Sequence, residues 1–243
     1  MENKVAIVTG ASVGIGRAVA LKMAKKGAKL VLVDINKQGL LKVQEEIKEY
    51  NCESLIFDLD VSDEQAVIKA VSDAINHFGR IDILVNNAAL WRNFEPFLEI
   101  STEKWQKFLQ INVMGVVYFT KAVLPNMIEN SYGRIVNVAS VAGVYGNANM
   151  AMYSATKGAV ISMTKALAKE VAGQGVVVNS VSPGTVSPSD NADTDYYELT
   201  DRCYAGRTGT AMENADLICF LASKDNGYIV GQNIQIDGSR RMV

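Results

Sequence analysis

The stretch MYSATKGAV places a phenol, Tyr153, four residues before an ammonium, Lys157, among small and apolar residues. Residues four apart on a helix share one face, so these two side chains can approach each other. A free phenol has a pKa of about 10 and is a poor base at neutral pH, whereas a nearby cation favours the phenolate and lowers that pKa. The pair therefore predicts a centre that takes a proton from an alcohol or returns one to a ketone.

A glycine-rich segment, TGASVGIGRA, follows the first apolar run of the chain, with Gly10, Gly14 and Gly16 where a strand would turn into a helix. Glycines at such a junction permit a tight turn and a close approach of the backbone to a pyrophosphate. The N-terminus of the following helix supplies N–H donors to the anion. Taken alone, the segment is equally compatible with a purely structural turn.

Asp34 ends the second apolar run. An acid about twenty residues beyond a glycine loop accepts hydrogen bonds from the ribose hydroxyls of adenosine. A carboxylate there repels the 2′-phosphate of NADP, and the positions at which NADP-binding chains usually carry a basic residue hold Val13 and Ile35. We therefore expect NAD as the cofactor rather than NADP.

Short apolar runs alternate with segments of helical period along the whole chain. The runs are β-branched and nearly continuously hydrophobic, as parallel strands covered on both faces should be. They cover residues 4–9, 29–34, 53–58, 81–86, 133–140, 175–182 and 232–237. Helices are expected at residues 14–26, 37–50, 63–78, 101–129, 151–172 and 213–223. This alternation predicts an α/β fold, a doubly wound parallel sheet of about seven strands with helices on both faces.

The chain shows no internal repeat, low-complexity tract or linker, so residues 1–243 are expected to form a single domain. One long stretch without clear periodicity lies between the sixth expected strand and the last helix. A loop of this length in a compact domain is often functional, so we expect a substrate lid near residues 185–210. The alternative is a disordered excursion on the surface.

Composition and charge exclude several classes of function. The net charge is −2 and the basic residues are scattered, which removes the footprint of a nucleic-acid-binding protein. Cys52, Cys203 and Cys219 are odd in number and far apart, so neither a disulfide framework nor a metal site is expected. No apolar run approaches the ~18 residues of a membrane span, and the N-terminus leads directly into a strand. We therefore expect an unprocessed cytoplasmic protein without a membrane partner.

The motifs, in this order and at these separations, resemble those of the short-chain dehydrogenase/reductase family over essentially the whole chain. Those motifs are TGASVGIG, NNAA at Asn86 to Ala89, INVMG with Asn112, VASVAG with Ser140, YSATK, and SPG at Ser182 to Gly184. The resemblance implies a Rossmann-type fold. It also implies four catalytic residues: Asn112, Ser140, Tyr153 and Lys157.

Each catalytic residue has a role that the resemblance implies. Tyr153 would be the acid and base, and Lys157 would also hydrogen-bond the nicotinamide ribose. Ser140 would hydrogen-bond the substrate oxygen. Asn112, a poor helix former within an expected helix, would hold a water molecule in a proton relay.

The resemblance also implies a set of cofactor contacts. Within it, Asp60 and Val61 would contact the adenine, and the backbone of Val186 would lie near the carboxamide. The full set is Gly10, Ser12, Gly14, Ile15, Gly16, Asp34, Asp60, Val61, Asn87, Ala88, Tyr153, Lys157, Pro183, Gly184 and Val186.

The chain departs from the family pattern at three positions. Ala89 replaces a glycine, which costs ~1 kcal/mol if that position needs a positive φ. Pro188 replaces a threonine that commonly bonds the carboxamide, which leaves open whether Ser187 or Ser189 substitutes for it. The C-terminal DGS replaces a common DGG, a change that we expect to be minor.

For six further residues the resemblance implies a position that faces the substrate, and the alternative is simple packing. This group is Trp91, Arg92, Val141, Tyr145, Asn147 and Met150.

The sequence therefore predicts an NAD-dependent oxidoreductase that moves a hydride between the nicotinamide and a secondary alcohol or ketone. It leaves the small-molecule substrate open between a hydroxysteroid and a small diol or polyol. One alternative is a 3-oxoacyl thioester reductase using NADPH, and another is a non-catalytic dinucleotide-binding sensor. The long helices at 101–129 and 151–172 are rich in Ala, Val and Met and pair across a two-fold axis in the family, so we expect a homotetramer or homodimer.

Overall fold

The computed structural model describes residues 1–92, 94–187 and 197–241 of the chain. One parallel sheet of seven strands runs in the order β3-β2-β1-β4-β5-β6-β7. Its strands are β1 (Val5–Thr9), β2 (Lys29–Asp34), β3 (Ser54–Asp58), β4 (Ile83–Asn86), β5 (Gly133–Val138), β6 (Val176–Pro183) and β7 (Asn233–Ile236). The doubly wound sheet predicted from the sequence is confirmed.

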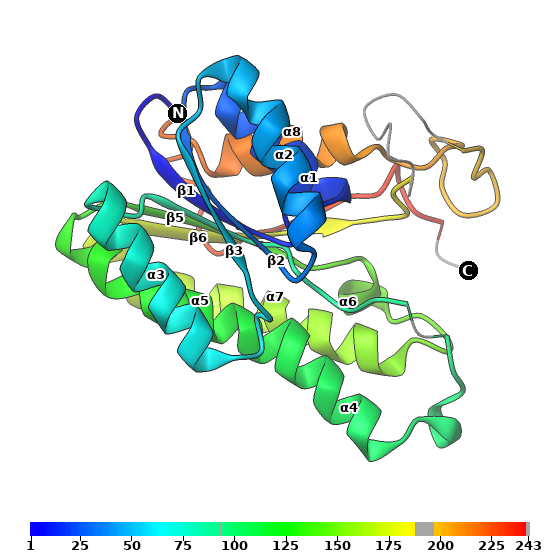
Figure 1. Cartoon of the computed structure of the whole chain (residues 1–243). Coiled ribbons are helices and arrows are strands. Elements are labelled where there is room, and N and C mark those ends of the chain that lie inside the picture. Colours follow the sequence, from blue (N-terminus) through cyan, green and yellow to red (C-terminus); the bar gives the residue numbers. More distant parts are fainter. Residues whose placement is uncertain (93, 188–196, 242–243) are drawn as a thin grey trace.

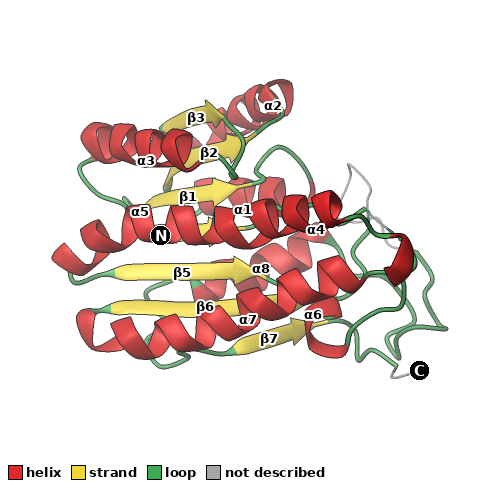
Figure 2. Cartoon of the chain, turned by 90° about the horizontal axis from the view of Figure 1, so that it is seen from below, coloured by secondary structure: helices red, strands yellow, loops and turns green. Residues whose placement is uncertain are grey.

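Helices cover both faces of the sheet (Figure 1). One face carries α1 (Gly14–Lys25), α2 (Lys37–Ile47) and α8 (Ala211–Leu221). The other face carries α3 (Glu64–Phe78), α5 (Gly115–Glu129) and α7 (Ala151–Val171). Two shorter helices are α4 (Thr102–Leu109), which leads into α5, and α6 (Ala142–Tyr145), which lies between β5 and α7. Figure 2 shows the strand arrowheads pointing toward one edge, where many of the connecting loops gather.

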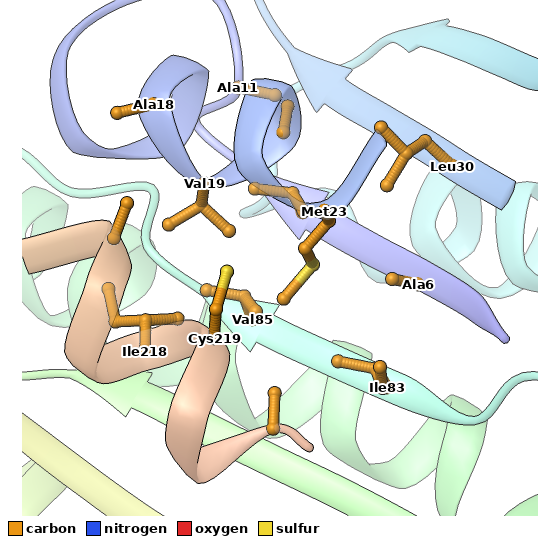
Figure 3. Packing of buried hydrophobic residues seen from close by; sticks show 14 of the residues in the cluster. Ala6, Ala11, Ala18, Val19, Met23, Leu30, Ile83, Val85, Ile218 and Cys219 are labelled. Carbon is orange, nitrogen blue, oxygen red and sulfur yellow. The ribbon is translucent and has the colours of Figure 1, made fainter. Parts of the chain in front are cut away.

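Two apolar cores lie on the two faces of the sheet. In the first, Val19 and Met23 of α1 meet Ile218 and Cys219 of α8 above Val85 of β4 (Figure 3). The second joins α3, α5 and α7 to the sheet and contains Phe119, Val123, Met127, Ile7 and Ile135. Because both faces are covered, every residue of β1 is buried, which explains its uninterrupted hydrophobic run.

The helix expected at 101–129 is interrupted. Its turn from Gln110 to Met114 is π-helical, and the chain returns to the α-helix at Gly115. Such a turn is frequent at functional sites, and this one contains Asn112, whose amide is bonded outside the helix, as described below.

One further boundary differs from the expectation, and one short helix was not expected. The last helix begins at Ala211 rather than residue 213, because Thr210 and Glu213 form a reciprocal capping box. The four-residue helix α6 has no counterpart in the expected elements, since one turn is too short to show a period.

The described residues contain one helix that is long and apolar enough to cross a membrane, Thr102–Glu129, judged by length and composition alone. The side chains of Phe119, Val123 and Met127 are buried in the second core, as those of a core helix are.

An acidic side chain is buried at the opposite edge of the sheet from the gathered loops. Asp82 has no exposed surface and accepts a hydrogen bond from the backbone N–H of Val5 at 3.0 Å. Its other oxygen contacts Lys4 Nζ at 3.0 Å and Arg80 at 2.6 Å. This carboxylate therefore holds the start of β1 beside the start of β4.

We expect Asp82→Ala to lower the free energy of unfolding by about 3 kcal/mol, because it leaves a buried N–H and two cations without their acceptor. The matched control is Asp73→Ala, which removes an exposed partner of Lys69 on α3 and should cost less than about 0.5 kcal/mol. Urea unfolding followed by circular dichroism measures both. Equal midpoints for the two variants would contradict this role of Asp82.

Candidate active site

The residues singled out from the sequence lie at the carboxyl edge of the sheet. The glycine loop follows β1, Asp34 ends β2, and Asn87 follows β4. Ser140 follows β5, and Pro183 ends β6. Strand order reverses between β1 and β4, and open α/β sheets bind ligands at such a switch point. Tyr153 and Lys157 join this edge because α7 begins there.

The glycine loop combines close packing with open space. A Cβ on Gly16 would lie 2.0 Å from the carbonyl oxygen of Gly10, and a Cβ on Gly10 would lie 2.8 Å from Asn87 Nδ2. Gly14 has a φ of +56° and would meet no atom within 4 Å. Close packing therefore favours glycine at Gly10 and Gly16. At Gly14 the backbone conformation favours glycine, and the space beside it is open.

The N-terminus of α1 fits a phosphate group. Its N-cap, Val13, makes no side-chain hydrogen bond, and its first turn contains no acidic residue. The first N–H groups of this helix therefore keep their capacity to donate to an anion. Ile15 in the same turn packs partly against the first core.

A threonine that the sequence analysis did not single out ties two loops together. Thr9 Oγ1 accepts hydrogen bonds from the N–H groups of Asn87 and Ala88 at 2.9 and 3.0 Å. Asn87 Nδ2 donates in turn to the carbonyl oxygens of Thr9 and Gly10, at 3.0 and 3.1 Å. The signal in the sequence was a hydroxyl at the end of an otherwise apolar strand, directly before the glycine loop.

Asp34 joins the glycine loop to the turn that follows β2. One of its carboxylate oxygens accepts from the N–H of Ser12 at 3.1 Å and the other from the N–H of Asn36 at 2.9 Å. Asp58, at the end of β3, is the register partner of Asp34, so two carboxylates stand side by side at this edge. Lys37 contacts Asp58 at 3.3 Å. Asp34 keeps further lone pairs that can accept from hydroxyl groups.

The two residues expected beside the adenine follow β3. Asp60 Oδ1 accepts from the backbone N–H and the hydroxyl of Ser62, at 2.9 and 2.7 Å, so this carboxylate stabilises its own turn. Val61 is buried against Gly115, where a Cβ would lie 2.8 Å from its side chain. Val61 thus offers an apolar wall.

Lys157 is buried beside the ring of Tyr153. Its Nζ lies 5.8 Å from the ring centroid and donates to the carbonyl oxygen of Val138 at 2.7 Å. Burial lowers the pKa of Lys157 to about 8. A Cβ on Gly143 would lie 2.5 Å from the backbone of Lys157, so α6 presses directly onto α7 here.

The pKa of Tyr153 is displaced in the direction opposite to the one expected from its lysine neighbour. Burial raises the pKa of Tyr153, and a hydrogen bond with the Ser140 side chain opposes that rise. The expected lowering by Lys157 is not found: desolvation dominates, and the ammonium is bonded to Val138. Ser140 is itself oriented, because its Oγ accepts from the N–H of Ala142 at 3.1 Å.

Asn112 joins the loop after β4 to α7. Its Oδ1 accepts from Leu90 N–H at 2.8 Å, and its Nδ2 donates to the carbonyl oxygen of Leu90 at 2.9 Å and to Thr156 Oγ1 at 3.1 Å. Thr156 then donates to the carbonyl oxygen of Tyr153 at 2.9 Å. These contacts fix the side-chain amide of Asn112 against Leu90 and Thr156. The expected part of Asn112 in a proton relay stays a prediction. The sequence analysis missed Thr156, because nothing distinguishes it from the other residues between Tyr153 and Lys157 in YSATK.

The residues expected around the nicotinamide lie between β5 and β7. Pro183 accepts from the N–H of Val141 at 3.1 Å, and Gly184 donates to the carbonyl oxygen of Ile236 at 3.0 Å. Val186 pairs with Gly209. Pro188 and Ser189, and with them the middle of the expected lid at 185–210, lie outside the described residues.

Two smaller expectations have a clear outcome. Ala89 does not adopt a positive φ, so it carries no conformational cost relative to glycine. Ser239, in contrast, has a φ of 60°, in the left-handed region where the glycine of a DGG would be unstrained. The change from DGG to DGS therefore carries a backbone cost.

Within the described ranges, no group of three His, Cys, Asp or Glu residues is arranged to hold a metal ion. A groove of about 380 Å³ lies where α7 ends and β7 begins, at the far edge from Tyr153, and is lined by Lys165, Ala168, Lys169, Ala172, Val230, Gly231 and Gln232.

Comparisons with known proteins agree with this geometry. The family model described as short chain dehydrogenase matches residues 4–197. The 3-oxoacyl-[acyl-carrier-protein] reductase FabG of Thermotoga maritima is 38% identical over 241 residues, which cover 98% of each chain. The 2-dehydro-3-deoxy-L-rhamnonate dehydrogenase (NAD(+)) of a Sphingomonas species is 36% identical over 243 residues, covering 98% of this chain and 95% of the relative.

Solved structures give the same result at the level of the fold. The crystal structure of NAD+-bound xylitol dehydrogenase matches with a TM-score of 0.90 and 35% identity, over 98% of this chain and 99% of that one. Levodione reductase matches with a TM-score of 0.89 and 30% identity, over 98% and 97%. The chain therefore belongs to the short-chain dehydrogenase family of oxidoreductases, which act on CH–OH or carbonyl groups with a nicotinamide dinucleotide.

Proposed function

We propose that this protein is an NAD-dependent dehydrogenase of secondary alcohols, or the reductase of the corresponding ketones. The observation that carries the proposal is the grouping of Tyr153 with the side chain of Ser140 and with the buried ammonium of Lys157, whose Nζ lies 5.8 Å from the centre of the Tyr153 ring. A non-catalytic dinucleotide sensor would need the glycine loop and Asp34 but not this arrangement.

The residues at the carboxyl edge fit a dinucleotide. The uncapped N-terminus of α1 and the open space at Gly14 suit the pyrophosphate, and Asp34 suits the adenosine ribose. The remaining contacts would come from Asp60, Val61, Asn87, Ala88, Pro183, Gly184 and Val186. When bound, the dinucleotide supplies the hydride acceptor for oxidation or the hydride donor for reduction.

The chain's own residues supply orientation and proton transfer. Ser140 hydrogen-bonds the substrate oxygen, and Tyr153 exchanges its proton. Because burial raises the pKa of Tyr153, the neutral phenol predominates at neutral pH and donates readily to a carbonyl. Oxidation of an alcohol needs the phenolate and therefore gains from rising pH.

The cofactor assignment rests on charge. Asp34 lies where the ribose hydroxyls would be, and a 2′-phosphate there would meet its carboxylate, while the neighbouring Asp58 contacts Lys37. Two similar proteins bear names that include NAD+, the rhamnonate dehydrogenase and the xylitol dehydrogenase. The relatives named as 3-oxoacyl-[acyl-carrier-protein] reductases support the second candidate, thioester reduction, for which we expect NADPH.

By resemblance Tyr145 and Asn147 face the substrate, and their polar groups, which are hydrogen-bonded to Gln235 and Arg240, suit a small polyol or diol better than a hydroxysteroid. We further propose one domain with a lid near 185–210, a cytoplasmic location, and a homotetramer or homodimer. Assembly would use the outer faces of α4, α5 and α7.

Tyr153→Phe should reduce kcat by about 10²- to 10⁴-fold, because the phenyl ring cannot exchange a proton. NADH binding, measured by fluorescence titration, should be unchanged. Tyr228→Phe is the control, since Tyr228 is almost fully exposed and should turn over like the wild type. A screen of secondary alcohols followed by NADH absorbance provides the substrate, and retained turnover in Tyr153→Phe would remove the acid–base assignment.

Lys157→Met should reveal the buried ammonium through the pH dependence of stability. The folded protein releases the lysine proton near its lowered pKa of about 8, whereas the unfolded chain keeps it up to about 10.5, so wild-type stability gains as pH rises between these values. The free energy of unfolding of wild type minus that of Lys157→Met should therefore increase by on the order of 3 kcal/mol from pH 7 to pH 10.5. Urea titrations across this range measure it, and a constant difference would refute the lowered pKa.

Asp34→Asn should raise KM for NADH about 10- to 100-fold, because it weakens charge-assisted hydrogen bonds to the ribose. The variant should also accept NADPH better relative to NADH than the wild type does. Asp73→Asn makes the same charge change on the exposed face of α3 and should alter neither value. Steady-state kinetics with both cofactors decide the matter, and a wild type that prefers NADPH would favour the thioester reductase.

A further inference from the structure

The segment after β7 is held firmly in place beside the segment that precedes α8. Arg240 forms an antiparallel bridge with Cys203, and Arg241 N–H donates to the carbonyl oxygen of Arg202 at 2.9 Å. The N–H of Tyr204 donates to the carbonyl oxygen of Ser239 at 3.0 Å. Backbone bonds on both sides thus fix the direction in which the side chain of Arg240 leaves the chain.

Arg240 differs from the other described arginines in its partners. Arg17, Arg80, Arg202 and Arg207 each contact a carboxylate. Arg92, Arg134 and Arg241 lie over aromatic rings. The guanidinium of Arg240 is partly buried and donates to the neutral Oδ1 of Asn147 at 2.8 Å, and no carboxylate pairs with it in the part of the chain that the structure describes.

Asn147 links this guanidinium to the catalytic helix. Its N–H donates to Ser154 Oγ at 3.3 Å, and Ser154 directly follows Tyr153 at the start of α7. Its carbonyl oxygen accepts from the N–H of Met150 at 3.2 Å. The same loop is tied to the one after β4, since Glu95 N–H donates to the carbonyl oxygen of Asn149 at 2.9 Å. Arg240 therefore lies against the loop that leads into Tyr153.

The neighbourhood offers donors for more than one oxygen. Gln235 Nε2 donates to the hydroxyl oxygen of Tyr145 at 2.5 Å, so the proton of that hydroxyl is free to be donated elsewhere. A guanidinium carries five N–H groups in a planar fork, and Arg240 commits one of them to Asn147. The fork that remains matches a carboxylate, which accepts two parallel hydrogen bonds.

We propose that Arg240 binds a carboxylate of the substrate, so that the substrate is a polyhydroxy acid whose reacting carbinol lies at Tyr153. Arg240 would be a specificity residue and would take no part in proton transfer. The inference rests on the proposed function, which it narrows from neutral polyols to their acids. The phosphate of a carrier-linked thioester has the same oxyanion chemistry, and the experiment distinguishes the two sources.

The test compares Arg240→Gln and Arg240→Lys with the wild type. Arg241→Gln is the matched control, because Arg241 is the adjacent cation and lies over the exposed ring of Tyr204. Calorimetry measures the binding of gluconate, xylonate, xylitol and pantetheine 4′-phosphate to the complex of enzyme with NADH. Steady-state kinetics with the acids and the polyol follow, with unfolding temperatures as a check on folding.

Arg240→Gln should weaken binding of the acids, and raise their KM, about 10- to 100-fold. Their kcat and the KM for xylitol should be unchanged. Arg240→Lys should recover part of the loss, since it keeps the charge but not the fork. Arg241→Gln should behave like the wild type.

Three outcomes would overturn the inference. An equal loss for xylitol and the acids would show that Arg240 only supports the loop. Tight binding of pantetheine 4′-phosphate with none of the acids would show that the anion is a carrier arm. Acid binding that Arg240→Gln leaves unchanged would place the carboxylate elsewhere. If the acids bind through Arg240 but no alcohol or ketone turns over, the proposed function fails while the binding site stands.

Discussion

The site depends on a positive charge that is held away from water. A buried ammonium is costly unless the protein supplies acceptors, and here the carbonyl oxygen of Val138 and the ring of Tyr153 take that part. This requirement fixes the end of β5 against the first turns of α7. The close contact at Gly143 follows from it, since a larger residue would push α6 off the lysine. The position of the buried ammonium and the packing of α6 against α7 therefore depend on the same contacts.

Around this pair, side chains bonded to backbone groups join loops that are far apart in the sequence. Thr9 and Asn87 connect the glycine loop to the loop after β4, and Asn112 connects that second loop to α7. Beneath them, Asn86 donates to Asn137 at 2.9 Å inside the sheet. Such bonds have fixed directions, whereas apolar contacts do not. They can hold a cofactor and a substrate in one register, which is what hydride transfer requires.

The sheet, most helix bounds and the gathering of the motif residues at one edge could be predicted, because periodicity and strand order determine them. The features that could not be predicted depend on how deeply a side chain is buried and on which residues of neighbouring elements lie beside each other. Asn112 was visible as a poor helix former, but its contact with Leu90, and with it the π-helical turn, needs the tertiary structure. Burial raises the pKa of Tyr153, and the spacing of two residues in a sequence does not show how deeply either of them is buried. Asp58 stands beside Asp34 only through pairing of β2 with β3.

The π-helical turn at Gln110–Met114 also sets how this part of the chain can vary. Successive residues of an α-helix are rotated by about 100° around its axis, and a wider turn holds one residue more than the regular helix. Deleting a single residue there would restore a regular α-helical turn and leave the rotation of α4 relative to α5 nearly unchanged, whereas a deletion within the regular part of α5 would rotate α4 by roughly that angle. A one-residue deletion should therefore disturb the helix direction less in this turn than elsewhere in α5, and its main effect would be on the contact of Asn112 with Leu90.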